Sequence, residues 1–237
     1  MKERGMIFNG EMVRALLDGR KTQTRRIMKA QPSEDFTPMN MALEADYKAR
    51  WYTPGIVDKD GYLQPAGKEV FGVANENEGY SCPFGAVGDR IWVRETWDRY
   101  NIDQDSHDMA YRATIPEDWP ESGRWRPSIH MPRWASRITL EITDVRVERL
   151  NAISEQDAQS EGVHTEVWDQ TVVARNYAAI DEFFQFWSED MPHYVEMNQL
   201  YRSSFRSLWE SIYGAENWQA NPWVWVIEFK RVEGGAA

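Results

Sequence analysis

The residues best suited to chemistry lie in one basic run at positions 19–26, with the sequence GRKTQTRR. The run places the ammonium group of Lys21 and the hydroxyl of Thr24 among the guanidinium groups of Arg20, Arg25 and Arg26. Cationic and hydroxyl groups of this kind can bind phosphate or carbonyl oxygens. The run is therefore our first candidate for a functional site, and the alternative is a cationic loop that only faces water.

The residues before the run indicate how it is positioned. Apolar side chains recur at helical spacing over about 10–18, Asn9 can cap the start of this helix, and Gly19 suits the position just after its end. We therefore expect the basic run to leave the end of a helix and to begin a short extended segment near Gln23 and Thr24.

Two glutamates outside the run are further candidates for a functional carboxylate. Glu95 follows a Gly-Asp turn in an alternating strand over 88–97, on the same face as large apolar residues. It either lies near solvent at the strand end or is buried beside a cation such as Lys21 or an arginine, because an unpaired buried charge is too costly.

The second glutamate, Glu161, ends a short predicted helix that begins with a capping box at 154–157 and closes at Gly162. A carboxylate at a helix C-terminus has its pKa raised by the macrodipole, which suits a group that holds and releases a proton. The alternative is a surface glutamate at a frayed helix end.

The segment 125–134 mixes aromatics, arginines and a histidine without regular structure and ends at Trp134. Such a loop can line a ligand pocket by stacking and cation–π contact. The alternative is a surface loop that is anchored by its tryptophans.

Composition limits the class of protein. The 237 residues include 27 basic and 38 acidic side chains, and the net charge of −11 opposes nonspecific attraction to nucleic acid. Any contact with a nucleoside, a modified base or short RNA must therefore be local. The single cysteine and four scattered histidines predict neither a disulfide nor a metal site, and we expect no cofactor. Without an apolar run of about 20 residues, we expect a cytoplasmic protein with no membrane contact.

Other segments complete the expected architecture. Residues 27–85 are rich in proline and glycine and predict turns and short strands, with a hairpin turn at Asp60-Gly61. A strand over 138–150 changes phase near Thr143-Asp144, as expected for a bulge where a strand curves to close a barrel. We also predict helices at about 179–189 and 198–213, a last strand at 223–230 and disorder over 233–237.

The run 19–26 fits the Gly-x-Lys-x-x-Thr-x-Arg signature of the ASCH domain family. Three further segments, 88–93, 153–161 and 225–230, follow in the order that this family requires. The chain resembles most the ASCH proteins that tailed phages and prophages encode. The resemblance implies an α+β fold, a PUA-like mixed β-barrel with flanking helices, in one domain over 1–237. Long insertions are expected at about 30–85, 98–132 and 163–198.

The small bacterial N4-acetylcytidine amidohydrolases of that family use a lysine, a threonine and a glutamate, which fall on Lys21, Thr24 and Glu161 by motif matching. The resemblance implies that Lys21 accepts a proton, Thr24 is the nucleophile and Glu161 donates a proton. A lysine serves as base when burial or nearby positive charge lowers its pKa. We assign substrate binding to five further residues: Arg20, Arg25, Arg26, Glu95 and Trp134.

Three functions remain open on these grounds. The first is hydrolysis of an acyl group from a cytidine-like nucleoside or base. The second is a PUA-like module that binds RNA or a modified base, or cleaves RNA without a metal. The third is a phage structural or host-interaction protein whose pocket is vestigial.

One geometric expectation follows from the resemblance. Lys21, Thr24 and Glu161 should converge at one mouth of the barrel, with the Lys21 amine within hydrogen-bond reach of the Thr24 hydroxyl or one water away. We expect Glu95 near the same pocket, paired with an arginine. We also expect a tryptophan or tyrosine from an insertion to form a pocket wall.

Overall fold

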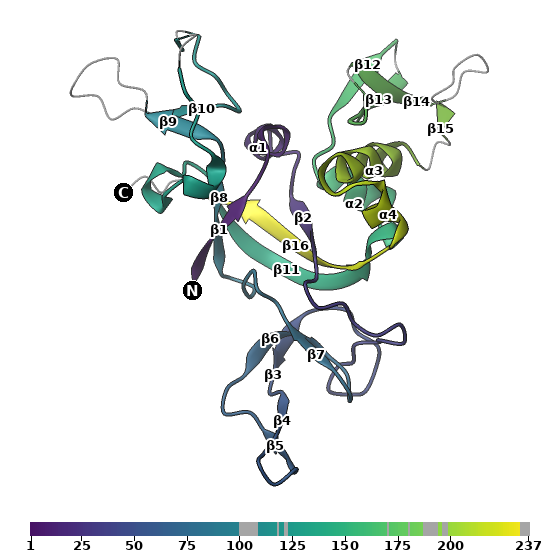
Figure 1. The fold of residues 1–237 in the computed structure, drawn as a ribbon. Coiled ribbons are helices and arrows are strands. Elements are labelled where there is room, and N and C mark those ends of the chain that lie inside the picture. Colours follow the sequence, from purple (N-terminus) through teal and green to yellow (C-terminus); the bar gives the residue numbers. More distant parts are fainter. Residues whose placement is uncertain are drawn as a thin grey trace.

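Five strands form a curved mixed sheet at the centre of the molecule (Figure 1). In the order of their pairing they are β1 (Glu3–Ile7), β8 (Arg90–Arg94), β11 (Thr139–Arg149), β16 (Trp223–Arg231) and β2 (Gln23–Ile27). β1 is parallel to β8, and the other neighbours are antiparallel. The structure, a computed structural model, describes residues 1–99, 109–117, 119–120, 123–169, 171–179, 181–186, 194–195 and 199–232.

The predicted bulge in the long strand is confirmed. The pairing of β11 with β16 shifts register between Ile142 and Asp144. On both sides of the shift the apolar side chains are buried, among them Leu140 and Val145. The extra residue therefore keeps one face of β11 on the core although its sequence phase changes, and it lets the strand bend. The long curve of β11 and β16 is visible in Figure 1.

The sheet does not close into the barrel that the sequence led us to expect. Among the described strands, β1 and β2 are its two edges and share no main-chain ladder. One side chain bridges the seam between these edges: the guanidinium group of Arg26 on β2 donates to the Ile7 carbonyl oxygen at the end of β1, 2.7 Å away. A cation–π contact of Arg26 with Phe8 lies beside this bond.

In the described part of the chain, four α-helices flank the sheet: α1 (Gly10–Leu17), α2 (Glu155–Ser160), α3 (Leu200–Tyr213) and α4 (Ala215–Gln219). The same residues include three short 3-10 helices, η1 (Ser128–His130), η2 (Arg133–Ala135) and η3 (Leu150–Ala152). α1 connects β1 to β2 across the open seam, while α2, α3 and α4 lie together beside the β2 edge (Figure 1). The helices expected at about 10–18 and 198–213 are confirmed, whereas α4 was not expected.

The proline- and glycine-rich region forms a separate group of short strands below the sheet in Figure 1. A three-stranded sheet consists of β3 (Arg50–Tyr52), β6 (Val70–Ala74) and β7 (Gly79–Ser81), and a hairpin consists of β4 (Gly55–Val57) and β5 (Leu63–Pro65). Gly61 in the hairpin turn has φ 88°. The left-handed conformation favours glycine at this point, which confirms the predicted turn.

Two further groups of strands lie above the sheet in Figure 1. One is the pair β9 (Trp97–Arg99) and β10 (Met109–Tyr111); the other contains β12 (Thr165–Trp168), β13 (Thr171–Asn176), β14 (Glu182–Phe186) and β15 (Tyr194–Val195). The helix predicted at about 179–189 is therefore wrong over 182–186. The phenylalanines of this segment favour a strand that can pair with β13. Residues 187–190 and 233–237 lie outside the described residues.

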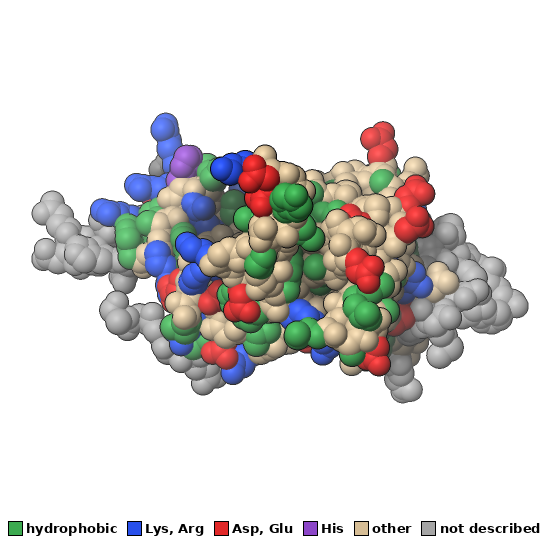
Figure 2. Space-filling view, turned by 90° about the horizontal axis from the view of Figure 1, so that it is seen from below, with side chains coloured by type: hydrophobic (Ala, Val, Ile, Leu, Met, Phe, Trp, Pro, Cys, Tyr) green, Lys and Arg blue, Asp and Glu red, His purple; other side chains and the backbone are tan. Residues whose placement is uncertain are grey.

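The result is a mixed α+β fold built mostly from sheet. Seen from below, Lys and Arg side chains gather at the left of the surface, the side of β9 and β10, and Asp and Glu side chains are frequent at the right (Figure 2). The charged side chains of this face are thus unevenly distributed. No helix in the described part of the chain has both the length and the apolarity needed to cross a bilayer.

Candidate functional site

The basic run is positioned by the end of α1, as expected. Asn9 caps the helix, since its side chain accepts a hydrogen bond from the Met12 amide at 2.8 Å. Gly19 follows the helix with φ 74°, and the Lys21 amide donates to the Ala15 carbonyl oxygen at 3.0 Å. This reversal directs the chain into β2. Lys21 and Thr24 are both buried there.

The end of α2 approaches the same place. Glu161 is the C-cap of α2, and Gly162 follows with φ 85°. A Cβ atom on Gly162 would lie 2.7 Å from the Cβ of Lys21 and 2.8 Å from that of Ala15. The glycine is therefore required by the close approach as well as by its backbone conformation. This contact brings Glu161 to Lys21 although 140 residues separate them in the sequence.

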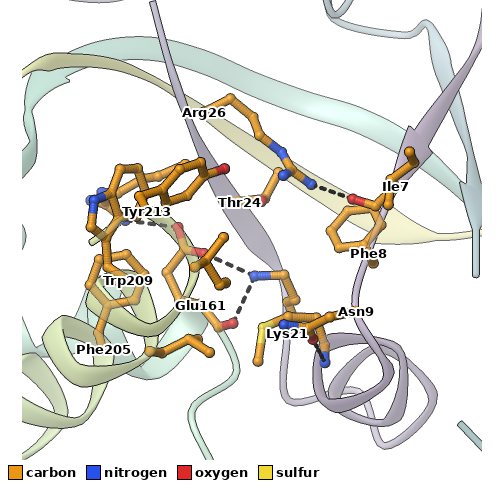
Figure 3. A pocket seen from close by; sticks show the side chains of 14 residues that line it. Ile7, Phe8, Asn9, Lys21, Thr24, Arg26, Glu161, Phe205, Trp209 and Tyr213 are labelled. Carbon is orange, nitrogen blue, oxygen red and sulfur yellow. Dashed lines mark hydrogen bonds and ion pairs between the residues drawn. The ribbon is translucent and has the colours of Figure 1, made fainter. Parts of the chain in front are cut away.

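Lys21 and Glu161 form a buried ion pair (Figure 3). The Lys21 Nζ lies 2.9 Å from the Glu161 Oε2 and 2.7 Å from its backbone carbonyl oxygen. Only 2% of the Lys21 side chain and 4% of the Glu161 side chain are exposed. An ammonium group has three N–H donors, so one remains after these two bonds.

The Lys21 pKa is lowered from its ordinary value. Burial is the main cause, because removal from water disfavours the charged form, and the nearby charges of Arg26 and Arg25 act in the same direction. The Glu161 carboxylate opposes the shift without reversing it. The expectation that burial and positive charge would make this lysine less basic is confirmed.

Arg25 lines the pocket, but its guanidinium group is engaged with carboxylates rather than open to a ligand. Its Nη1 lies 3.1 Å from the second oxygen of Glu161, and its Nη2 lies 2.8 Å from Glu148 and 3.4 Å from Asp157. The side chain is fully buried. Arg25 therefore orients Glu161, and Arg146 extends the charged cluster by binding Asp157 and Glu148.

Thr24 contributes a hydroxyl group to this cluster. It is 4% exposed and lines the same pocket as Lys21 and Glu161. Among the described residues its hydroxyl makes no hydrogen bond, so Lys21 and Thr24 are not bonded directly, and the expected contact through one water stays a prediction. The three residues nevertheless converge on one cavity in the seam between β1 and β2 (Figure 3).

The cavity has a volume of about 210 Å³ and mainly apolar walls. One wall comes from the end of β1 and from α1, and the other from α3, which contributes Phe205, Leu208, Trp209, Ile212 and Tyr213. An aromatic wall was expected, but from an insertion. The aromatic residues of this wall come instead from α3, which begins after the insertion expected at 163–198. The volume is below the ~300–1,000 Å³ of typical ligand pockets, so the cavity suits a small ligand.

The two remaining arginines of the run have different positions. Arg26 lines the cavity where it bridges β2 to Ile7. Arg20 does not line it: its guanidinium group donates to the carbonyl oxygens of Gly162 and Val163 and pairs with Asp18. The substrate contact expected for Arg20 is therefore not seen, and this side chain holds the loop after α2.

Glu95 and Trp134 also lie outside this cavity. Glu95 is buried and forms a two-pronged ion pair with Arg137, which confirms the alternative of a buried, paired carboxylate. It does not line the cavity, so the expectation that it lies near the pocket is wrong. Trp134 is 62% exposed and packs edge-on against Trp97. It behaves as the surface tryptophan that we weighed as the alternative.

Sequence reasoning treated the apolar stripe of α3 as packing surface and so missed half of the pocket. A usable signal was present, because the stripe ends in Ile212 and Tyr213, which remain 51% and 37% exposed. It also missed Glu148 and Asp157. No feature of their local sequence distinguishes them from surface carboxylates.

Within the described residues, no group of three or more His, Cys, Asp or Glu side chains is arranged to hold a metal ion. Comparisons of this chain with models of known protein families, with curated proteins and with solved structures found no match.

Proposed function

We propose that this chain is a PUA-like protein of the ASCH type that hydrolyses the amide of an N-acylated cytidine-like nucleoside or base. The observation that carries the proposal is the buried Lys21–Glu161 pair beside the unpartnered Thr24 hydroxyl, in a cavity with aromatic walls. These are the three side chains that the ASCH resemblance assigns to catalysis. The open β1–β2 seam of the sheet, bridged by Arg26, leaves room for the cavity beside these side chains.

The ion pair supplies both a base and an acid. Transfer of one proton from Lys21 Nζ to Glu161 Oε2 along their 2.9 Å hydrogen bond gives a neutral amine and a neutral carboxylic acid. The burial that lowers the Lys21 pKa favours this transfer. No proton from solvent is needed to reach the reactive form.

The reaction then follows from acyl transfer. The Thr24 Oγ1 attacks the acyl carbonyl carbon while its proton moves to the Lys21 amine. The bond to the amine of the base breaks as Glu161 donates its proton to the leaving nitrogen. Water hydrolyses the resulting threonine ester, which releases the carboxylic acid and restores the hydroxyl. Atoms and charges balance without a metal.

The test is turnover of N4-acetylcytidine by the purified protein, followed by chromatography. We expect deacetylation by the wild type, none by Thr24→Ala, and partial activity for Thr24→Ser, which keeps a hydroxyl at the same position. Wild-type turnover no higher than that of Thr24→Ala would contradict the proposal.

A second candidate is a non-catalytic module that binds RNA or a modified base. It is favoured by the mutual pairing of Lys21 and Glu161, which leaves few polar groups free for chemistry, and by aromatic side chains on which a base can stack. Salt-sensitive binding of a short RNA that survives Thr24→Ala but is lost in Arg26→Ala would select this function. Cleavage of that RNA in the presence of a chelator would identify a metal-independent ribonuclease instead.

A further inference from the structure

Asn9 holds a defined orientation at the mouth of the cavity. Its side chain caps α1 by accepting a hydrogen bond from the Met12 amide at 2.8 Å. Because a backbone N–H can only donate, the accepting atom must be the Oδ1 oxygen. The Nδ2 amino group therefore points away from the cap, and the side chain cannot flip without losing the cap.

The Nδ2 group has no hydrogen-bond partner among the described residues. Asn9 lines the cavity together with Lys21 and Thr24, and Figure 3 shows it beside Lys21 on the α1 side. Unlike these two buried residues, Asn9 is exposed. It thus presents a free donor to whatever part of a ligand lies at the rim, while the unpartnered Thr24 hydroxyl lies within.

We propose that Asn9 is a specificity-determining residue: its Nδ2 donates to a hydrogen-bond acceptor on the ring that carries the acylated nitrogen. The inference rests on the proposed function and narrows its substrate class. In an N-acylated cytosine the ring nitrogen and the ring carbonyl oxygen lie along the same edge as the acylated amine. With the amide carbonyl at Thr24, these acceptors are the polar atoms left to meet a donor at the rim.

The location at a helix N-terminus strengthens this preference for an acceptor. The positive end of the α1 macrodipole lies at Asn9, and the guanidinium group of Arg26 lies across the same cavity. This positive potential favours binding of a ring edge that carries hydrogen-bond acceptors. It does not favour binding of a ring edge that carries only C–H groups.

Two substitutions separate recognition from the structural role of the cap. Serine and aspartate cap helices about as well as asparagine, so Asn9→Ser and Asn9→Asp should keep the thermal unfolding midpoint of the wild type. Both lack the amide donor. Asn9→Ala loses the cap as well and serves as the control for a purely structural effect.

The experiment compares each variant on two substrates, N4-acetylcytidine and acetanilide, whose ring has no acceptor. For Asn9→Ser we expect KM for N4-acetylcytidine to rise about two- to tenfold, the value of one neutral hydrogen bond, with KM for acetanilide unchanged. Asn9→Asp should raise KM for N4-acetylcytidine further, because a carboxylate repels the acceptor. Cytidine and aniline serve as binding probes in parallel, measured by calorimetry.

The outcomes for Asn9 and for the proposed function are distinguishable. If the wild type turns over N4-acetylcytidine and Asn9→Ser leaves both KM values unchanged, the role of Asn9 is refuted while the hydrolase stands. If the wild type turns over neither substrate but binds cytidine more tightly than Asn9→Ser does, the hydrolase fails and the role of Asn9 stands. Equal increases in KM for both substrates in Asn9→Ser, or equal cytidine affinity in wild type and Asn9→Ser, would overturn the proposed role of Asn9.

Discussion

Glu95 and Glu161 are both buried carboxylates, with 2% and 3% of their surfaces exposed, yet they lie in different surroundings. Both oxygens of Glu95 accept hydrogen bonds at 2.9 Å from one guanidinium group, that of Arg137, which also stacks on Tyr111. Glu161 divides its oxygens between Lys21 and Arg25. Beside it lies a cavity with an unpartnered hydroxyl.

The cation beside each carboxylate distinguishes the two pairs: Glu95–Arg137 is a structural ion pair, and Lys21–Glu161 is the candidate for proton transfer. An arginine stays protonated at any ordinary pH, so the Glu95–Arg137 pair has no proton to exchange. A buried lysine with a lowered pKa, such as Lys21, loses its proton more readily than an exposed lysine. Burial and pairing alone therefore do not mark a functional glutamate; the identity of the cation and access to a cavity do.

The largest effect should follow from replacing Lys21. Lys21→Met keeps the length of the side chain but removes the base, and proton transfer by a positioned group contributes about 10²–10⁴-fold to rate. We expect kcat/KM for N4-acetylcytidine to fall by that factor. Lys48→Met is the matched control, since the Lys48 side chain is 66% exposed and lies outside the cavity. Turnover by Lys21→Met equal to that of the control would remove the lysine from the mechanism.

Replacing Arg137 should affect stability instead. Arg137→Met leaves the buried Glu95 carboxylate unpaired, which we expect to lower the free energy of unfolding by about 3 kcal/mol, the low end of the range because Arg137 is partly exposed. Urea denaturation at neutral pH measures this. Arg133→Met, which breaks an exposed pair with Glu3, should cost about 1 kcal/mol or less. Equal effects of the two substitutions would show that burial of Glu95 matters little.

Replacing two partly exposed aromatic residues, Tyr213 and Trp134, should have different effects on substrate binding. Tyr213 lines the cavity and Trp134 does not. Stacking of a base on an aromatic side chain contributes about 1–3 kcal/mol, so Tyr213→Ala should raise KM by the corresponding factor while Trp134→Ala leaves it unchanged. Steady-state kinetics decide this, and a higher KM in Trp134→Ala alone would place the binding site elsewhere.

The smallest effects concern the titration of Lys21, which NMR can follow at its ε-methylene group. Arg26 lowers the Lys21 pKa, so Arg26→Gln should move the Lys21 titration to higher pH. Glu161 raises that pKa, so Glu161→Gln should move the titration to lower pH. Shifts of both variants in the same direction would contradict the electrostatic description of the pair.

Local sequence signals predicted the elements that carry the charged groups. Asn9 and Gly19 delimit α1, Ser154 and Gly162 delimit α2, and the phase change in 138–150 located the bulge of β11. Each of these depends on a few neighbouring residues. The convergence of Lys21 and Glu161 was anticipated only because a family resemblance linked two distant segments.

The unpredicted features depend on contacts between distant segments. Residues 182–186 are a strand because β13 is available to pair with them, which a single-segment reading as helix does not consider. The α3 stripe forms a pocket wall because the sheet leaves its β1–β2 seam open. Glu95 pairs with Arg137 rather than with the basic run for a similar reason: β8 and β11 are neighbours, and β8 and β2 are not.

The most direct test is to measure kcat/KM for N4-acetylcytidine in Glu161→Gln and Glu95→Gln, two equal substitutions of buried carboxylates. We predict a loss of about 100-fold or more for Glu161→Gln, which removes the proton donor, with circular dichroism and the unfolding midpoint showing an intact fold. Glu95→Gln should be less stable but turn over substrate at the wild-type rate. Wild-type turnover by Glu161→Gln, or loss of turnover in a folded Glu95→Gln, would contradict the assignment of chemistry to the Lys21–Glu161 pair.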